Sequence, residues 1–136
     1  MRVARGIIER LGGRAFSIRK HDKVAYHAWG MFASPLLTVL LATTEQVAAA
    51  AGVQPKAARE RMLPILAQTI TNYAALGAAE TLSGPIVRGD VDTIKKHLRV
   101  LRRIPIARDV YIALARASLG YLPAKNLGEL ERILGA

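Results

Sequence analysis

The sequence predicts an all-α protein, a helical bundle around one long central helix. Residues 23–52 form the central stretch, which carries no formal charge from Val24 to Thr44 and has apolar residues on every side of a helical wheel. A helix of this kind is either the buried centre of a bundle or a membrane span. Shorter segments with apolar residues at helical spacing follow it, separated by glycines and prolines. We therefore expect several shorter helices to pack along the central one.

Residues 1–18 predict a short helix and a strand in front of the bundle. Apolar residues have helical spacing over residues 2–11, and Gly12 and Gly13 should end that helix. Residues 14–18, RAFSI, alternate polar and apolar side chains as a strand does. One strand cannot form a sheet alone, so we expect it to pair with another chain or to lie extended. This stub looks like the last unit of an α/β domain.

Prolines, glycines and capping residues set the other helix boundaries. Asp22 is placed to cap the central helix, Pro35 should kink it because proline removes a backbone hydrogen bond, and Gly52 should end it. Later helices are expected over residues 55–76, bent at Pro64, over 91–103, capped by Asp90, over 105–122, and from Asn126, which has capping-box spacing to Glu129. The expected inward residues are Met62, Leu66, Ile70 and Tyr73, then Val91, Ile94, Leu98 and Leu101, then Ile106, Val110, Leu114 and Ala117.

Composition limits the location and the chemistry. With 136 residues the chain fits one domain, and without cysteine it can form neither a disulfide nor a thiolate metal site. The three histidines are scattered outside any carboxylate cluster, so we predict no metal site. We expect a cytoplasmic protein.

Basic residues outnumber acidic ones by 20 to 10, and they concentrate in residues 1–23 and 88–116. Solvated helix faces explain such clusters most simply, but two basic faces could also form one anion-attracting surface. Nucleic-acid modules usually add base-stacking aromatics or a recognition helix, and the sequence has neither. We therefore do not expect nucleic acid as a partner.

A membrane span is the competing interpretation of the central stretch. About 20 apolar residues suffice to cross a bilayer, and basic residues flank the N-terminal end. Against this interpretation, the following helices are amphipathic, as in soluble bundles, and the stretch contains polar side chains. These are His27, Ser34, Thr38, Thr43 and Thr44. We expect no membrane association; extraction only by detergent would reverse that expectation.

Three segments carry a family resemblance: DKVAYHAWGMFAS (22–34), TLSGPIVRGDVDTIKKHL (81–98) and VYIALARASLGYL (110–122). They resemble the helical C-terminal domain called domain of unknown function 2520, over about residues 12–134. In that family the domain follows a Rossmann-like NADP-binding domain, in an arrangement similar to pyrroline-5-carboxylate reductase and, more distantly, 6-phosphogluconate and 3-hydroxyacid dehydrogenases. The resemblance implies a fold like the 6-phosphogluconate dehydrogenase C-terminal domain. It makes residues 1–18 the remnant end of a Rossmann-like domain and residues 19–136 a helical dimerisation and substrate-side domain.

The resemblance implies NADP as the cofactor of a full-length relative, but this chain offers no site for it. A dinucleotide fold needs a glycine-rich turn so that the backbone can approach the pyrophosphate, and no Gly-x-Gly occurs in the sequence. We expect no cofactor in this chain and no redox activity from it alone. Truncation, a mis-assigned start at Met1 or a separately made partner would each explain the missing domain.

Four residues are candidates for a substrate site. Lys23 and His27 lie four apart, on one face of a helix, where an ammonium can polarise a carbonyl or imine and an imidazole can relay a proton. The resemblance strengthens this catalytic pair, because related enzymes place a polar group four residues after a lysine beside the nicotinamide. Ser34 follows two turns later and could hydrogen-bond a substrate. Arg88 offers a planar fork for a carboxylate or phosphate. Each also has a plain structural explanation, in a surface position, a backbone hydrogen bond or an ion pair.

Two functions from different classes follow. The first is the helical dimerisation and substrate-side domain of an NAD(P)-dependent oxidoreductase-like protein, forming a homodimer and completed by a nucleotide-binding domain in cis or in trans. The second is a stand-alone helical homodimer that uses a basic face to bind an acidic partner or nucleic acid. Salt dependence distinguishes them, because binding through phosphates weakens steeply as salt rises.

Overall fold

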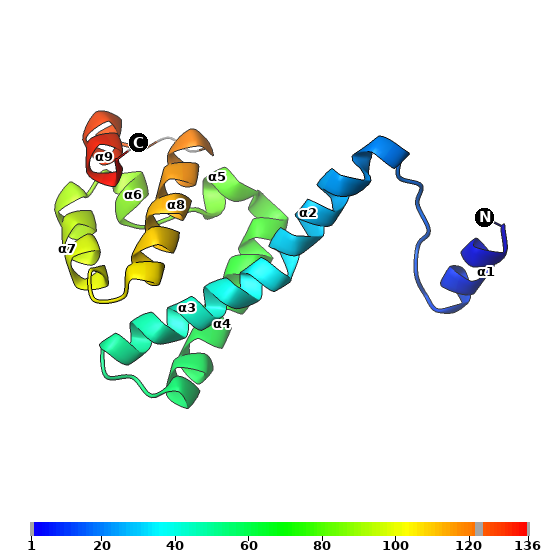
Figure 1. Cartoon of the computed structure of the whole chain (residues 1–136), viewed down its shortest axis with the longest axis horizontal. Helices are drawn as coiled ribbons and strands as arrows, with labels where there is room; N and C mark the ends of the chain where they lie inside the picture. The colour runs from blue at the N-terminus through cyan, green and yellow to red at the C-terminus, as the bar shows by residue number, and fades with distance from the viewer. Residues whose placement is uncertain (1, 122–123, 136) are drawn as a thin grey trace. The chain divides into compact units, whose positions relative to one another are not determined.

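The protein is described by a computed structural model over residues 2–121 and 124–135. It divides into two compact units, one up to Thr38 and one from Val39 onward. Helices make up the regular structure of both units, and no strand occurs in the described part of the chain (Figure 1). The predicted all-α class is confirmed. The division expected between residues 18 and 19 rests on the family resemblance and stays a prediction.

The first unit begins with a short helix that ends at glycines, as predicted. Its elements are α1 (Arg2–Arg10), the 3-10 turn η1 (Lys20–Asp22), α2 (Lys23–Ala33) and the start of α3 (Pro35–Ala50). Gly12 adopts a φ of 74°, a conformation that costs glycine little, and the Gly13 N–H closes the helix end by donating to the Ile8 carbonyl at 2.9 Å.

The predicted strand over residues 14–18 is wrong, because these residues form an irregular connection. A strand needs a neighbour to pair its backbone groups, and no other described segment is a strand. Phe16 instead packs edge-on against Tyr26 of α2, with ring centroids 5.7 Å apart, and Tyr26 lies 5.2 Å from the ring of Trp29. Aromatic contacts to α2 therefore take the place of sheet pairing.

Pro35 was predicted to kink one central helix, and the structure instead divides the stretch at this proline into α2 and α3. Ser34 leaves helical geometry, with φ of −138° and ψ of −71°, and α3 begins at Pro35. Gly52 then ends the stretch with a φ of 78° and donates its N–H to the Ala49 carbonyl at 2.9 Å.

The central stretch is not buried within the chain, contrary to expectation. No described residue of α2 is buried, and Thr43 is the buried residue of α3. Lys20–Ala50 is long and apolar enough to cross a membrane by length and composition, and its most apolar window has no buried share. A helix that a partner chain covers would have the same length and composition. Within its own unit, neither part of this stretch is therefore covered as expected, apart from Thr43.

The second unit contains the C-terminal part of α3 and the helices that follow. These are α4 (Pro55–Leu76), α5 (Ala78–Thr81), α6 (Pro85–Arg88), α7 (Val91–Leu101), α8 (Pro105–Tyr121) and α9 (Leu127–Leu134). Within this unit α3 and α4 run antiparallel (Figure 1), and Arg59 of α4 pairs with Glu45 of α3 at 2.8 Å. The predicted helix starts at Pro55, Val91 and Pro105 are confirmed. The helix that begins at Pro105 was predicted to end at about Leu122, which lies outside the described residues.

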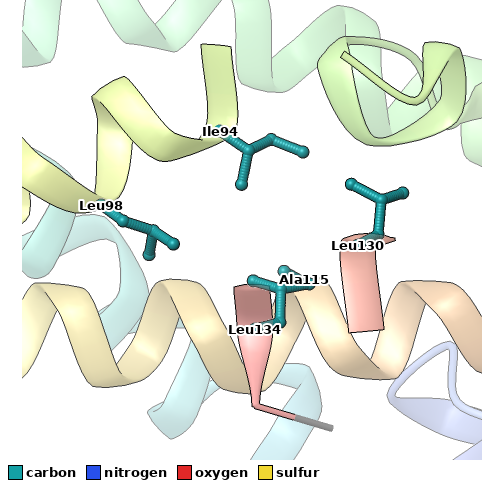
Figure 2. Close-up of a cluster of buried hydrophobic side chains, with 5 residues drawn as sticks. All are labelled: Ile94, Leu98, Ala115, Leu130 and Leu134. Atoms are coloured by element: carbon teal, nitrogen blue, oxygen red, sulfur yellow. The ribbon is translucent and has the colours of Figure 1, made fainter. Parts of the chain in front are cut away.

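The core lies between α7, α8 and α9. Its buried members are Ile94, Leu98, Ala115, Leu130 and Leu134 (Figure 2). Ile94 and Leu130 are completely inaccessible to solvent. Burying one such side chain stabilises a fold by about 1.5–3 kcal/mol, so this cluster holds the three helices together.

The inward faces agree with the prediction in α7 but not in α8. Ile94, Leu98 and Leu101 are buried as expected. In α8, Ile106 is 67% exposed and Leu114 is 51% exposed. The residues that follow them, Ala107 and Ala115, are buried instead. Small side chains let the helices approach closely, so α8 turns a larger apolar face away from the core.

Candidate functional site

The predicted catalytic pair, Lys23 and His27, lies at the start of α2. Both side chains are exposed, and neither has a hydrogen bond or ion pair within the described residues. Their spacing in a helix places them on one face. The geometry therefore leaves both groups accessible to a ligand.

Asp22, just before this pair, does not cap α2 as predicted. Its side chain makes no capping hydrogen bond. Arg19 Nε instead donates to Asp22 Oδ2 at 2.6 Å, and His21 Nε2 lies 3.4 Å from Oδ1. The preceding 3-10 turn gives Asp22 helical backbone angles, whereas an N-cap residue usually has extended ones.

Ser34 lies at the break between α2 and α3. Its carbonyl accepts hydrogen bonds from the Thr38 N–H at 2.9 Å and from Thr38 Oγ1 at 3.1 Å. Its hydroxyl is exposed and makes no hydrogen bond within the described chain. The backbone of Ser34 thus stabilises the break, and its side chain is left accessible.

Arg88 ends the short helix α6 in the second unit, so it belongs to a different unit from the other three candidates. Its side chain is exposed, and no carboxylate in the described residues pairs with it. Asp90, two residues later, caps α7 as predicted by accepting the Thr93 N–H at 3.1 Å. Hydrogen bonding from Thr93 lowers the pKa of the Asp90 carboxyl, with smaller contributions from the Arg88 and Lys96 charges.

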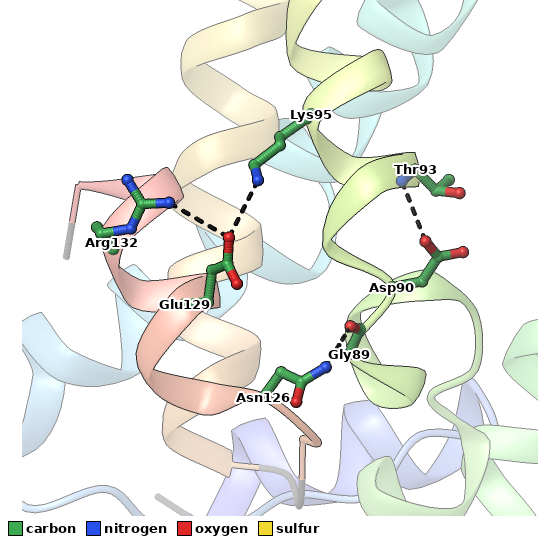
Figure 3. A network of polar contacts seen from close by, with 7 residues as sticks. All are labelled: Gly89, Asp90, Thr93, Lys95, Asn126, Glu129 and Arg132. Carbon is green, nitrogen blue, oxygen red and sulfur yellow. Dashed lines mark hydrogen bonds and ion pairs between the residues drawn. The ribbon is translucent and has the colours of Figure 1, made fainter.

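The loop that presents Arg88 is held against the segment before α9. Asn126 Nδ2 donates to the Gly89 carbonyl at 3.0 Å (Figure 3), and the Lys125 N–H donates to the Val87 carbonyl at 3.3 Å. Gly89 has a φ of 66°, and a Cβ there would clash with the Lys125 carbonyl oxygen. Only glycine fits this contact, so the backbone fixes the position from which Arg88 projects.

The capping box predicted for Asn126 and Glu129 is wrong. Asn126 precedes α9 in a left-handed conformation and its side chain makes no capping bond, because it binds Gly89. Glu129 Oε1 accepts from Lys95 Nζ at 3.0 Å and from Arg132 Nη2 at 3.2 Å. Hydrogen bonding from Lys95 and its charge lower the pKa of the Glu129 carboxyl, and Arg132 adds to this.

An apolar pocket of about 400 Å³ lies within the second unit between α3, α7 and α8. Its polar edge is formed by His97 and Tyr111, whose Nδ1 and hydroxyl lie 3.2 Å apart, with the two rings edge-on. Its walls are Leu40, Thr43, Thr44, Val47, Val100, Leu101, Ala107, Val110 and Leu114. A cavity of this size, apolar with a few polar groups at its edge, is typical of small-molecule sites.

His97 and Tyr111 give this pocket its chemistry. Burial raises the pKa of the Tyr111 phenol, which keeps it protonated and able to donate or accept a hydrogen bond. From the sequence alone, His97 is only one of three scattered histidines, and Tyr111 is not singled out. His97 is exposed, and the two side chains meet across α7 and α8, a non-local contact that spacing along either helix does not reveal.

No group of three or more His, Cys, Asp or Glu side chains in the described residues is placed to hold a metal ion. The structure thus offers two separate settings: the accessible Lys23 and His27 on α2, and the apolar pocket with His97 and Tyr111 in the second unit. Arg88 does not line the pocket.

No curated protein and no solved structure matches the chain significantly. A family model, described as Domain of unknown function (DUF2520), matches residues 1–118, which is most of the chain. The match includes α2, the loop that carries Arg88, and α7. The chain therefore belongs to the DUF2520 family, whose function is unknown.

Proposed function

We propose that this chain is the helical dimerisation and substrate-side domain of an NAD(P)-dependent oxidoreductase-like protein. The apolar surface of α2 and α3 carries the proposal. Val24 is 81% exposed, Trp29 62% and Phe32 72%. Soluble monomers rarely leave a large contiguous apolar patch in water, so a surface of this kind marks an interaction site. A second copy of the chain is the partner that the family resemblance favours.

The residues of this chain do not fit a dinucleotide. The described part has no sheet, and the sequence has no Gly-x-Gly turn with which to approach a pyrophosphate. In the proposed protein a nucleotide-binding domain, in cis or in trans, would hold the NAD(P) that supplies hydride.

The roles proposed for this chain are binding and proton movement. The Lys23 ammonium would polarise a substrate carbonyl or imine, and the His27 imidazole would move a proton at that atom. Both groups are accessible and lie four residues apart on α2. The Ser34 hydroxyl and the Arg88 guanidinium are the proposed substrate-binding groups, the latter for a carboxylate or phosphate.

Reading the coding DNA upstream of the Met1 codon tests the proposal. About 450 nucleotides would encode a domain of roughly 150 residues. We expect an in-frame strand, glycine-rich turn and helix there, and we expect the joined protein to bind NADPH and to lose substrate turnover in Lys23→Met. A nearby upstream stop codon, together with no NADPH-binding protein co-purifying with the chain, would contradict the proposal.

A further inference from the structure

A recess of about 310 Å³ in the second unit is lined by four cationic side chains. Its lining residues are Lys95, Leu98, Arg99, Arg102, Arg108 and Ile133. We call it the cationic recess. It shares no lining residue with the apolar pocket.

The helical repeat brings the charges of the cationic recess together. Lys95 and Arg99 are four residues apart on α7, so they share one face of that helix. Arg102 is the residue just after the helix, and it keeps helical backbone angles, so it continues their i, i+4, i+7 spacing. Arg108 joins them from α8, across the turn between the two helices. The floor is apolar, formed by the buried Leu98 and the partly buried Ile133.

Only one of these cations has an acidic partner in the described residues. Lys95 pairs with Glu129, which also binds Arg132 outside the recess (Figure 3). Arg99, Arg102 and Arg108 form no ion pair with a described carboxylate. Like charges that converge on one concave site repel one another, and an anion placed among them removes that repulsion.

We propose that the cationic recess binds the phosphate or diphosphate group of a soluble phosphorylated ligand. Arginine matches phosphate oxygens with a planar fork of donors, and three arginines converge here. The recess is a small open site with six lining residues rather than a long track, and no aromatic side chain lines it for base stacking, which argues against nucleic acid. The apolar floor suits the carbon skeleton of a small ligand. This inference goes beyond the proposed function and depends on neither the dimer nor a cofactor.

Titration calorimetry of the whole chain with inorganic pyrophosphate tests the cationic recess. We expect saturable binding that Arg99→Gln and Arg102→Gln each weaken by at least about tenfold, the loss expected for one charge-assisted hydrogen bond. Arg102→Lys should bind with intermediate affinity, because it keeps the charge but loses the fork. Thermal melts establish that each variant is folded.

Arg103→Gln is the matched control. Arg103 is the exposed neighbour of Arg102 on the same turn and does not line the recess, so its loss changes the net charge equally. We expect it to change pyrophosphate affinity by less than about twofold. Equal losses in Arg102→Gln and Arg103→Gln, or no saturable binding at all, would overturn the proposal.

Two further arms separate other sources of phosphate. We expect no co-sedimentation with vesicles of phosphatidylcholine and phosphatidic acid. We also expect pyrophosphate to displace any duplex DNA that binds the chain. Vesicle or DNA binding that requires Arg102, with no pyrophosphate binding, would overturn the assignment to a soluble ligand.

Discussion

Asn126 donates a side-chain hydrogen bond to the carbonyl of Gly89, across 37 positions of sequence, at 3.0 Å. This contact joins the loop that carries Arg88 to the start of α9 (Figure 3). Gly89 approaches the Lys125 backbone so closely that a Cβ would clash with the Lys125 carbonyl oxygen. The loop and the C-terminal helix therefore depend on each other.

Gly89→Ala should destabilise the fold strongly. Alanine would have to adopt a φ of 66° and would meet the Lys125 backbone. A left-handed conformation alone costs an L-residue about 1–2 kcal/mol, so we expect a loss of at least about 2 kcal/mol in urea unfolding. Gly120→Ala is the control: Gly120 lies within α8 with open space around it, and alanine there should be neutral or stabilising. Equal stabilities of the two variants would contradict the close contact.

Asn126→Gly should isolate the side-chain hydrogen bond. Glycine accepts the left-handed backbone of this position, so the variant loses the bond to Gly89 without adding strain. We expect a loss of about 1 kcal/mol in the free energy of unfolding. Asn126→Ala adds left-handed strain and should lose about 1 kcal/mol more. If both variants matched the parent chain, the bond would not stabilise the loop.

Stability should fall in acid, partly through Asp90 and Glu129. Their hydrogen bonds and cationic neighbours lower the pKa of both carboxyls below the ordinary values of 3.8 and 4.5. A lowered folded-state pKa stabilises the fold above the unfolded pKa, and this contribution disappears as the pH falls through the folded value. We expect the urea midpoint to drop as the pH falls below about 4.5.

Glu129→Gln should make that drop smaller, whereas Glu131→Gln should not. Glu131 is exposed on the same helix and has no ion-pair partner in the described residues. Urea melts at several pH values measure both variants. An unchanged pH profile in Glu129→Gln would contradict a role for its pairing with Lys95.

Leu130→Ala should test the core between α7, α8 and α9. Leu130 is completely buried among Ile94, Ala115 and Leu134 (Figure 2). Truncation of a buried leucine costs about 2–5 kcal/mol, because apolar contacts are lost and a cavity remains. Leu127→Ala makes the same change on the same helix at a position 42% exposed and should cost much less. Similar losses of unfolding free energy in the two variants would contradict a core between α7, α8 and α9.

The sequence predicted α7 well because its signals are local. Ile94 and Leu98 repeat at helical spacing, and Asp90 provides the cap just before the first turn. α8 was predicted as a helix but with the wrong inward face, because Ala115 rather than Leu114 faces the core. Hydrophobicity ranks leucine above alanine, whereas close packing of two helices favours the smaller side chain.

Features that depend on distant parts of the chain were missed or mispredicted. Polar and apolar side chains alternate over residues 14–18 as in a strand. A strand also requires a second strand to pair with, and the sequence of these five residues does not show whether one is present. The His97 and Tyr111 pair forms across two helices, and Asn126 uses its side chain for Gly89 rather than for its own helix. The roles of Lys23, His27, Ser34 and Arg88 remain predictions that substrate assays of the variants would test.

The central claim is that a second copy of the chain covers the apolar surface of α2. Light scattering coupled to size exclusion, without detergent, tests it most directly. We expect a mass of twice 14.7 kDa for the parent chain and a monomer for Trp29→Glu with Phe32→Glu. Tyr121→Glu, at a position 79% exposed on α8, should leave the dimer intact. A monodisperse monomer of the parent chain, or a chain recovered only with detergent, would contradict the claim.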